Sequence, residues 1–267
     1  MNNRQEAARE IGLDPTRPTV LITGSSRGIG LGFAARYADD GWNVIATARN
    51  PAGAVELQNL AARLDSVVVE ELDVLNETEL DLLANKFANV PIDVLINNAA
   101  FHGGKPDDHR LGTYNYSTFE RYMAVNVFGP LKVCEAFFKS VAKSNQKKIV
   151  TLTTRLSCLS SPSPFNAFHF QAISKTALNR AMRALQLELR QTGIIAALIS
   201  PGRTDTDGLA ASRAAVAASL GDGALPPNQP APLSVDQSVA SMVRVIADLD
   251  ESYDGRHLDF QGNSIPW

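Results

Sequence analysis

The residues best suited to chemistry begin in a glycine-rich loop near the start of the chain. The β-branched and aliphatic run 19–22 is followed by Gly24, Gly28 and Gly30, which is typical of a buried parallel strand that turns into a helix. Such a turn directs several backbone N–H groups and the positive end of a helix at one point, which suits a pyrophosphate. Glycines are needed there because a Cβ would block the turn or hold the ligand away. Taken alone, the loop could also be an ordinary tight turn.

Length and composition limit the class of protein. The chain has 267 residues, 45% hydrophobic and 20% charged, with a formal net charge of −3, enough for one α/β domain with a large core. The mild acidity gives no reason to expect a nucleic-acid partner or an anionic membrane. No apolar run approaches the roughly 18 residues of a membrane span. Cys134 and Cys158 lack metal-type spacing, so we expect no metal site and a reduced, cytoplasmic protein.

Apolar periodicity predicts strands that alternate with helices along the chain. We expect further strands at 42–48, 66–70, 92–96, 147–153, 193–199 and 257–260, with helices at 57–64, 77–88, 117–142 (interrupted by Gly129-Pro130), 172–191, 209–220 and 236–249. This alternation predicts the α/β class: a single-domain, Rossmann-type, doubly wound parallel sheet with helices on both faces. Ligands then bind beyond the carboxyl ends of the strands.

The domain is expected to span residues 18–267, after a loosely held extension at 1–17 with one short helix near 5–11. The segment 205–234 departs from the strand–helix alternation, because an alanine-rich helical piece is followed by a run rich in glycine and proline. Since it follows the carboxyl end of a strand, we expect it to cover the pocket as a substrate lid. A plain surface connection is the alternative.

Several motifs together resemble the short-chain dehydrogenase/reductase family, over residues 18–267. They are the Gly-x-x-x-Gly-x-Gly loop with Thr23 in front, Leu72-Asp73-Val74, Asn97-Asn98-Ala99-Ala100 and the segment Pro201 to Thr206. Ala100 replaces the glycine that the family usually has. The ending Gly255 to Trp267 resembles the carbonyl-reductase branch that includes the sniffer and C-factor proteins.

The resemblance implies a dinucleotide cofactor, and two arginines favour NADP(H). Ala48 and Arg49 end the second strand, where a carboxylate would favour a ribose 2′-OH and an arginine favours a 2′-phosphate. Arg27 lies in the glycine loop and could reach the same phosphate. The full set of expected cofactor-binding residues is Gly24, Ser26, Arg27, Gly28, Ile29, Gly30, Arg49, Asp73, Val74, Asn98, Ala99, Lys175, Pro201, Gly202, Thr204 and Thr206.

The family's catalytic positions are only partly retained. The resemblance assigns the proton work to an Asn, a Ser, a Tyr and a Lys, which align with Asn126, Thr154, Gln171 and Lys175. A threonine hydroxyl can still donate to a substrate oxygen, so that exchange is mild. Gln171 has no proton to surrender near neutral pH. General acid–base help contributes about 10² to 10⁴ in rate, so another group must handle the proton or none moves.

His169 and water are the candidates for that proton, and a second histidine is a candidate substrate contact. His169 lies two residues before Gln171 and has a suitable ordinary pKa, although a structural role is the main alternative. His102 follows the Asn97 segment and is a candidate substrate contact at the pocket mouth. Water held by Asn126 and Lys175 could also relay the proton. The segment 155–170 is expected to line an apolar substrate cleft.

The sequence therefore predicts an NADP(H)-dependent oxidoreductase with an atypical proton relay, acting on a small-molecule carbonyl, alcohol or activated C=C. A non-redox enzyme on this scaffold (dehydration, cyclisation or isomerisation) and a catalytically silent cofactor-binding protein are the alternatives. The family often pairs the helices at 117–142 and 172–191 with a neighbour, which implies a homodimer or homotetramer, although the branch also contains monomers.

Overall fold

One eight-stranded sheet organises the protein. The structure is a computed structural model that describes residues 8–160, 168–220 and 231–267. The strands lie in the order β3-β2-β1-β4-β5-β6-β7-β8, with every neighbouring pair parallel except β7 and β8. Their bounds are β1 (Thr19–Ile22), β2 (Asn43–Ala48), β3 (Val67–Glu71), β4 (Val94–Asn97), β5 (Lys148–Leu152), β6 (Ile195–Ser200), β7 (His257–Asp259) and β8 (Ser264–Ile265).

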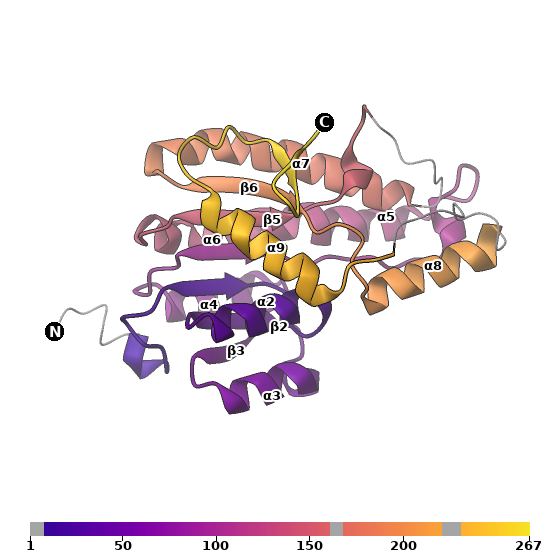
Figure 1. The fold of residues 1–267 in the computed structure, drawn as a ribbon. Helices are drawn as coiled ribbons and strands as arrows, with labels where there is room; N and C mark the ends of the chain where they lie inside the picture. The colour runs from indigo at the N-terminus through magenta and orange to yellow at the C-terminus, as the bar shows by residue number, and fades with distance from the viewer. Residues whose placement is uncertain (1–7, 161–167, 221–230) are drawn as a thin grey trace.

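Helices cover both faces of the sheet (Figure 1). One face packs against α2 (Gly28–Asp39), α3 (Val55–Arg63) and α9 (Val235–Asp248). The other packs against α4 (Glu77–Lys86), α6 (Gly129–Ala142) and α7 (His169–Leu189). The remaining elements are α5 (Tyr116–Met123), α8 (Asp207–Leu220) and the short turns η1 (Pro51–Gly53), η2 (Pro106–His109), η4 (Arg155–Ser157) and η5 (Arg190–Thr192). The predicted α/β class with a doubly wound sheet is confirmed.

The central strands read as continuous apolar runs because both of their faces are buried. In β1, Val20 and Ile22 contribute to the core cluster on the α2 side, whereas Leu21 contributes to the cluster on the α7 side. Successive side chains of a strand point to opposite faces, so each alternates between the two layers. The glycine loop and the loop after β4 then emerge side by side, where the order of strands reverses.

The long helix predicted at 117–142 is broken earlier than the Gly129-Pro130 pair. Between α5 and α6 lies a π-helical turn, η3 (Ala124–Phe128), in which the Gly129 N–H donates to the Ala124 carbonyl. Pro130 has no N–H, and its ring would clash with the carbonyl four residues before it, at Asn126. The widened turn relieves that clash and carries Asn126.

The described part of the N-terminal extension is held more firmly than expected. Ala8 and Leu13 are 4% and 2% exposed and belong to the core cluster on the α7 side. The Asn43 side chain accepts from the Asp14 backbone N–H at 3.0 Å and donates to the Asp14 carbonyl at 2.7 Å. Residues 8–17 therefore lie against the amino ends of the strands. Residues 1–7 of the predicted extension lie outside the described part.

The segment predicted as a lid leaves the sheet at the carboxyl end of β6. Its two described ends are joined, because the Leu233 N–H donates to the Arg203 carbonyl and the Asp205 N–H donates to the Leu233 carbonyl, at 2.7 and 2.8 Å. From this base α8 extends past the carboxyl ends of the strands (Figure 1). Residues 221–230 of the predicted lid lie outside the described residues, so the lid stays a prediction.

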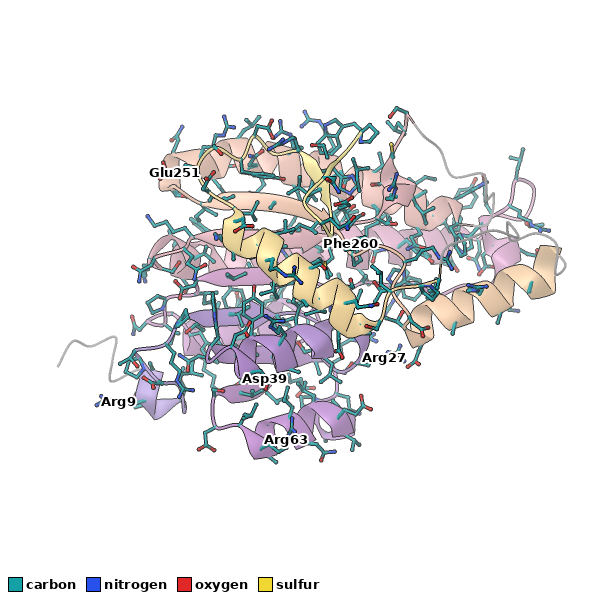
Figure 2. The ribbon with its side chains drawn as sticks, in the orientation of Figure 1. Arg9, Arg27, Asp39, Arg63, Glu251 and Phe260 are labelled. Carbon is teal, nitrogen blue, oxygen red and sulfur yellow. The ribbon has the colours of Figure 1, made fainter. Side chains whose placement is uncertain are left out.

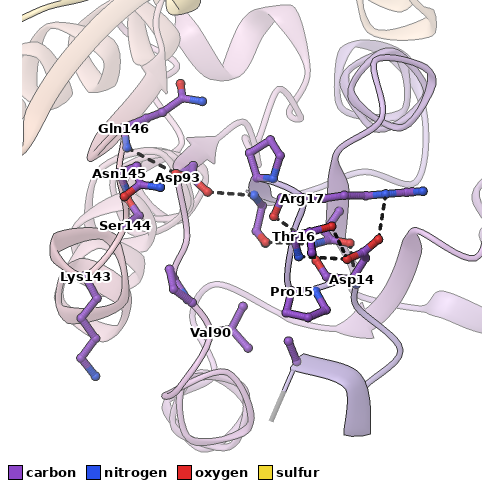
Figure 3. A pocket seen from close by; sticks show the side chains of 15 residues that line it. Asp14, Pro15, Thr16, Arg17, Val90, Asp93, Lys143, Ser144, Asn145 and Gln146 are labelled. Atoms are coloured by element: carbon purple, nitrogen blue, oxygen red, sulfur yellow. Dashed lines mark hydrogen bonds and ion pairs between the residues drawn. The ribbon is translucent and has the colours of Figure 1, made fainter. Parts of the chain in front are cut away.

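A buried carboxylate ties together the opposite, amino-terminal end of the sheet. Asp93 is 7% exposed and accepts from the backbone N–H groups of Thr19, Asn145 and Gln146 at 3.0 to 3.3 Å. It lies in a surface pocket between the N-terminal segment and the end of α6 (Figure 3). Since its partners come from two other segments, the start of β1 and the turn after α6, this pocket is a structural junction at the end of the sheet opposite the glycine loop.

Replacing Asp93 with alanine should destabilise the fold. The change leaves three backbone N–H groups without their acceptor, so we expect a loss of about 2 to 4 kcal/mol in the free energy of unfolding. Urea unfolding followed by circular dichroism measures it. The matched control is Asp81→Ala, at an exposed aspartate on α4, which should change stability by less than about 0.5 kcal/mol. Equal stability of both variants would contradict this role of Asp93.

Candidate active site

The glycine loop forms a cradle that side chains would fill. Gly24 and Gly28 have φ angles of 72° and 57°, in the left-handed region that favours glycine. A Cβ at Gly30 would lie 2.2 Å from the Gly24 carbonyl oxygen and 2.5 Å from the Asn98 amide nitrogen. The loop therefore needs glycine at these positions for two reasons, backbone conformation and close approach.

Hydrogen bonds fix this loop to the segment after β4. The Thr23 hydroxyl accepts from the backbone N–H groups of Asn98 and Ala99 at 3.1 Å each. In return, the Asn98 side chain donates to the carbonyls of Thr23 and Gly24, both at 2.9 Å. The cradle is thus preorganised before any ligand arrives.

The amino end of α2 is open to an anion. Arg27 occupies the N-cap position without a side-chain cap, and the first turn contains no acidic residue, so the helix presents its positive end uncapped. Across this end lies Thr206, whose methyl group would be 3.5 Å from a Cβ on Gly28. Ser26 is exposed, while Ile29 is partly buried and packs on the core. The loops after β1 and β6 therefore face each other across the site.

Two arginines stand at the edge of this site. Arg27 lies at the end of α2 that points toward α8 (Figure 2), and Arg49 directly follows β2. Both are exposed, and neither forms an ion pair with another residue of the described ranges. Their guanidinium groups remain available to a ligand phosphate.

Asp73 and Val74 line the next loop, after β3. The Asp73 backbone N–H donates to a Glu79 carboxylate oxygen at 2.6 Å, and the Asp73 side chain accepts from the Leu75 N–H at 3.0 Å. A Cβ on Gly129 would lie 2.7 Å from a Val74 methyl group. Val74 thus packs against the first turn of α6, which fixes the loop at the carboxyl edge of the sheet.

The segment after β6 is equally constrained. The Pro201 carbonyl accepts from the hydroxyls of Thr204 and Ser238 at 3.1 and 2.7 Å. Gly202 has a φ of 76°, and the Phe260 ring would be 2.9 Å from a Cβ at this position. The Thr206 hydroxyl accepts from the Leu209 N–H at 3.2 Å at the start of α8. All four predicted cofactor residues of this segment therefore lie on one fixed loop.

Lys175 is a buried cation. It is 5% exposed, and its ammonium donates to the Leu152 carbonyl at 2.7 Å. Desolvation lowers the pKa of Lys175 to about 8. Within the described residues no carboxylate is paired with it, so its charge is directed at the site rather than neutralised.

Gln171 and Thr154 lie close to this lysine in the fold. Gln171 and Lys175 are one turn apart on α7 and share a helix face. Thr154 follows β5, and its hydroxyl accepts from the Leu156 N–H at 3.3 Å. That hydroxyl keeps its proton free to donate.

Asn126 is fully buried and clamps a backbone segment. Its side-chain oxygen accepts from the Phe101 N–H at 2.7 Å, while its amide nitrogen donates to the Phe101 carbonyl at 3.1 Å and to the Ser174 hydroxyl at 3.2 Å. These contacts connect the π turn, the loop after β4 and α7. Sequence reasoning missed the parts of Phe101 and Ser174; no motif links their positions to Asn126.

His169 lies apart from Gln171. Its Nδ1 is 3.0 Å from the Tyr114 hydroxyl, and the Tyr114 ring contacts both the His169 ring and the Phe170 ring. Two residues along a helix rotate the direction of a side chain by about 200°. His169 and Gln171 therefore point to opposite sides of α7.

His102, in contrast, faces Gln171. The residue keeps an exposed surface, and desolvation by the surrounding protein lowers the pKa of His102 to about 4. The positive charge of Lys175 lowers it further, and a hydrogen bond with the Gln171 side chain opposes these effects. The site thus brings His102, Gln171 and Lys175 together.

Other kinds of site are not found in the described part of the chain. None of its helices is long and apolar enough to cross a membrane. Its histidines, cysteines and carboxylates form no cluster of three or more that could hold a metal ion. Cys134 and Cys158 are both buried, and neither forms a disulfide.

Comparisons with known proteins agree with this geometry. Over 177 residues the chain is 32% identical to the C-signal protein of Myxococcus xanthus, covering 66% of this chain and 93% of that protein. It is 29% identical to an uncharacterised oxidoreductase of Schizosaccharomyces pombe, over 96% of this chain and all of the relative. The structure of an NADPH-bound carbonyl reductase from chicken fatty liver is similar, with a TM-score of 0.80 and 25% identity over 94% of this chain and all of that one.

A second solved structure, a putative short-chain dehydrogenase/reductase from Burkholderia multivorans with bound NADP, has a TM-score of 0.76 and 26% identity, over 94% of this chain and all of that one. The sequence model of the short chain dehydrogenase family matches residues 18–217. That match covers the glycine cradle, the π turn with Asn126 and the helix that carries Lys175. The chain belongs to the short chain dehydrogenase family.

Proposed function

We propose that this protein is an NADP(H)-dependent oxidoreductase that acts on a small-molecule carbonyl, alcohol or activated C=C, with a proton relay that uses no tyrosine. The observation that carries the proposal is the buried, unpaired Lys175 at the same sheet edge as a preorganised phosphate cradle. Burial of a cation without a counter-ion is costly, which makes Lys175 a functional-site candidate. The NADPH- and NADP-bound relatives lend further support.

The residues present fit a phosphorylated dinucleotide. The glycine cradle and the open end of α2 suit its pyrophosphate, since a Cβ at Gly30 would fill the cradle. Arg27 and Arg49 would hold the 2′-phosphate. Asp73, Val74, Asn98 and Ala99 would border the adenosine, and the loop from Pro201 to Thr206 would border the nicotinamide. NADP(H) supplies or accepts the hydride when bound.

The chain's own groups bind and orient the substrate oxygen. The Thr154 hydroxyl and the Gln171 amide can both donate hydrogen bonds to it. Lys175 stabilises negative charge that develops there, and it acts in a desolvated site where charge is weakly screened. Asn126 is a positioning residue in this account, because it holds the Phe101 backbone and Ser174.

The described side chains in the proposed substrate-binding region are mostly apolar or aromatic. Phe101, Tyr122 and Phe170 form part of one aromatic cluster, and Cys158 is buried near the end of η4. Residues 161–167 of the predicted cleft segment lie outside the described residues. We further propose that the protein is cytoplasmic. We also propose that it forms a homodimer or homotetramer through exposed apolar side chains, which are Phe128 on η3 and Ile173 and Leu187 on α7.

Turnover and cofactor binding test this proposal together. NADPH titration by fluorescence should give a Kd in the micromolar range or below, and the protein should oxidise NADPH with at least one member of a panel of aldehydes, ketones, quinones and activated alkenes. Gln171→Tyr serves as a control for the scaffold. A silent natural protein that binds NADPH, beside an active Gln171→Tyr variant, would contradict the proposal.

The choice of NADPH over NADH should depend on the two arginines. An R27A/R49A double variant should bind NADPH about tenfold to a hundredfold more weakly, because charge-assisted hydrogen bonds to a phosphate contribute about 1.5 to 3 kcal/mol. The Kd for NADH should change by less than about threefold. Isothermal titration calorimetry measures both affinities.

The matched control for that experiment is Arg63→Ala, at an exposed arginine near the end of α3. It removes a positive charge away from the site and should leave both affinities unchanged. If R27A/R49A weakens NADH and NADPH equally, the arginines do not recognise the 2′-phosphate.

A further inference from the structure

We propose that His102 moves the proton in this active site: its imidazole accepts the hydroxyl proton of an alcohol substrate during oxidation and returns it during carbonyl reduction. This inference rests on the proposed oxidoreductase function and deepens it. The geometry of two elements carries it: Asn126 holds the Phe101 backbone, next to His102, against Ser174 on α7, and the Ser174 hydroxyl donates to the Gln171 carbonyl at 3.0 Å. Gln171, which hydrogen-bonds His102 through its side chain, occupies the position where the family's tyrosine is expected.

The backbone that carries His102 is fixed from behind. Asn126 binds both the N–H and the carbonyl of Phe101, the residue immediately before His102. On the other side, a Cβ at Gly103 would lie 2.6 Å from the Phe101 ring, so the chain turns tightly after His102. The imidazole is therefore presented from a constrained loop at the carboxyl end of β4.

The groups around the His102 ring leave one of its two nitrogens available to bind substrate. The Gln171 side chain hydrogen-bonds the imidazole from α7, and the charge that acts on it from the same helix is the Lys175 ammonium. Asn126 on η3 and the neighbours Phe101 and Gly103 are uncharged. Since an imidazole has two nitrogens and Gln171 takes one, the second can bind a hydroxyl.

Desolvation of the ring and the Lys175 charge lower the pKa of His102 to about 4, so the ring is neutral at neutral pH. A neutral imidazole is a proton acceptor at neutral pH, so His102 is suited to the oxidising direction. In the reducing direction the donor is the imidazolium, whose population rises as pH falls toward that pKa. The exposed side of the residue allows its proton to exchange with solvent.

The proposed step balances. The O–H bond of the alcohol would break as its proton bonds to the free imidazole nitrogen of His102, and bound NADP⁺ would accept the hydrogen of the adjacent C–H bond with its electron pair, as hydride. The substrate is oxidised and NADP is reduced. Alcohol and NADP⁺ thus give carbonyl, NADPH and one proton, which passes from His102 to water.

His169 provides a matched comparison because it is a second histidine of the same region with a different partner. Its ring is bonded to Tyr114 on the opposite side of α7 from Gln171. Substitution of His169 should therefore leave proton transfer intact. Comparing the two variants therefore separates a role of His102 in proton transfer from a general effect of removing a histidine in this region.

The kinetic test compares His102→Asn with His169→Asn, both checked by circular dichroism and by their Kd for NADPH. With NADP⁺ and 4-nitrobenzyl alcohol, 1-phenylethanol or cyclohexanol, kcat of His102→Asn should fall by about 10² to 10³, and added imidazole should restore part of it. His169→Asn should stay within about threefold. For the natural protein, kcat/KM for oxidation should be level from about pH 5 to about pH 7.

A second readout does not depend on turnover. The protein has four histidines, and NMR of labelled imidazole rings, assigned with His102→Asn, follows each one. The His102 signal should stay that of a neutral ring down to about pH 5, and its pKa should rise in Lys175→Met, which removes the facing charge. A His102 ring that titrates near its ordinary value and ignores Lys175→Met overturns the inference.

The remaining outcomes separate the two proposals. A natural protein that turns over, with His102→Asn as active as His169→Asn, overturns the role of His102 and leaves the oxidoreductase function standing. A natural protein that binds no NADPH and turns over none of the alcohols or carbonyls overturns both. Loss of activity in His102→Asn with the NADPH Kd unchanged and imidazole rescue supports both.

Discussion

The arrangement of the site depends on one buried carboxamide. Asn126 joins the π turn to the Phe101 backbone and to Ser174, so it sets the distance between the loop after β4 and the helix α7. Hydrogen bonds of this kind matter because each buried amide group would otherwise be desolvated without a partner. Pro130 forces the turn that presents Asn126. The missing N–H of Pro130 therefore affects the position of the proposed reacting groups through one side chain, that of Asn126.

A second constraint is electrostatic. Lys175 is buried without a carboxylate partner among the described residues, and its ammonium donates to the Leu152 carbonyl. Desolvation first, and then this uncompensated charge, lower the pKa of His102 to about 4. The charge also leaves a positive potential where a substrate oxygen would gain electron density. In the usual family arrangement such a lysine lowers the pKa of a phenol. Here it lies beside an amide and an imidazole, and under our proposal its charge keeps the imidazole neutral and able to accept a proton at neutral pH.

Much of the fold was accessible from the sequence because its strands are buried on both sides and its helices end at glycines and caps. The continuous run in β1 and the turn at Gly24, Gly28 and Gly30 predict their structures with few alternatives. The interruption of the long helix was predicted at Gly129-Pro130, whereas the π turn lies before this pair, since a proline affects the carbonyl four residues before it. The short antiparallel strand β8 has no pattern of its own and forms through pairing with β7. In the site, motif positions identified Asn126 and Lys175, but neither periodicity nor spacing could decide which way His102 and His169 point, because both orientations depend on tertiary contacts.

The most direct test of the account is a crystal structure with NADP⁺ and an alcohol bound. It should have the 2′-phosphate between Arg27 and Arg49, and the alcohol oxygen within hydrogen-bond distance of a His102 ring nitrogen and the Gln171 amide. An alcohol oxygen bonded instead to the Tyr114 hydroxyl, with His102 turned away from Gln171, would contradict it.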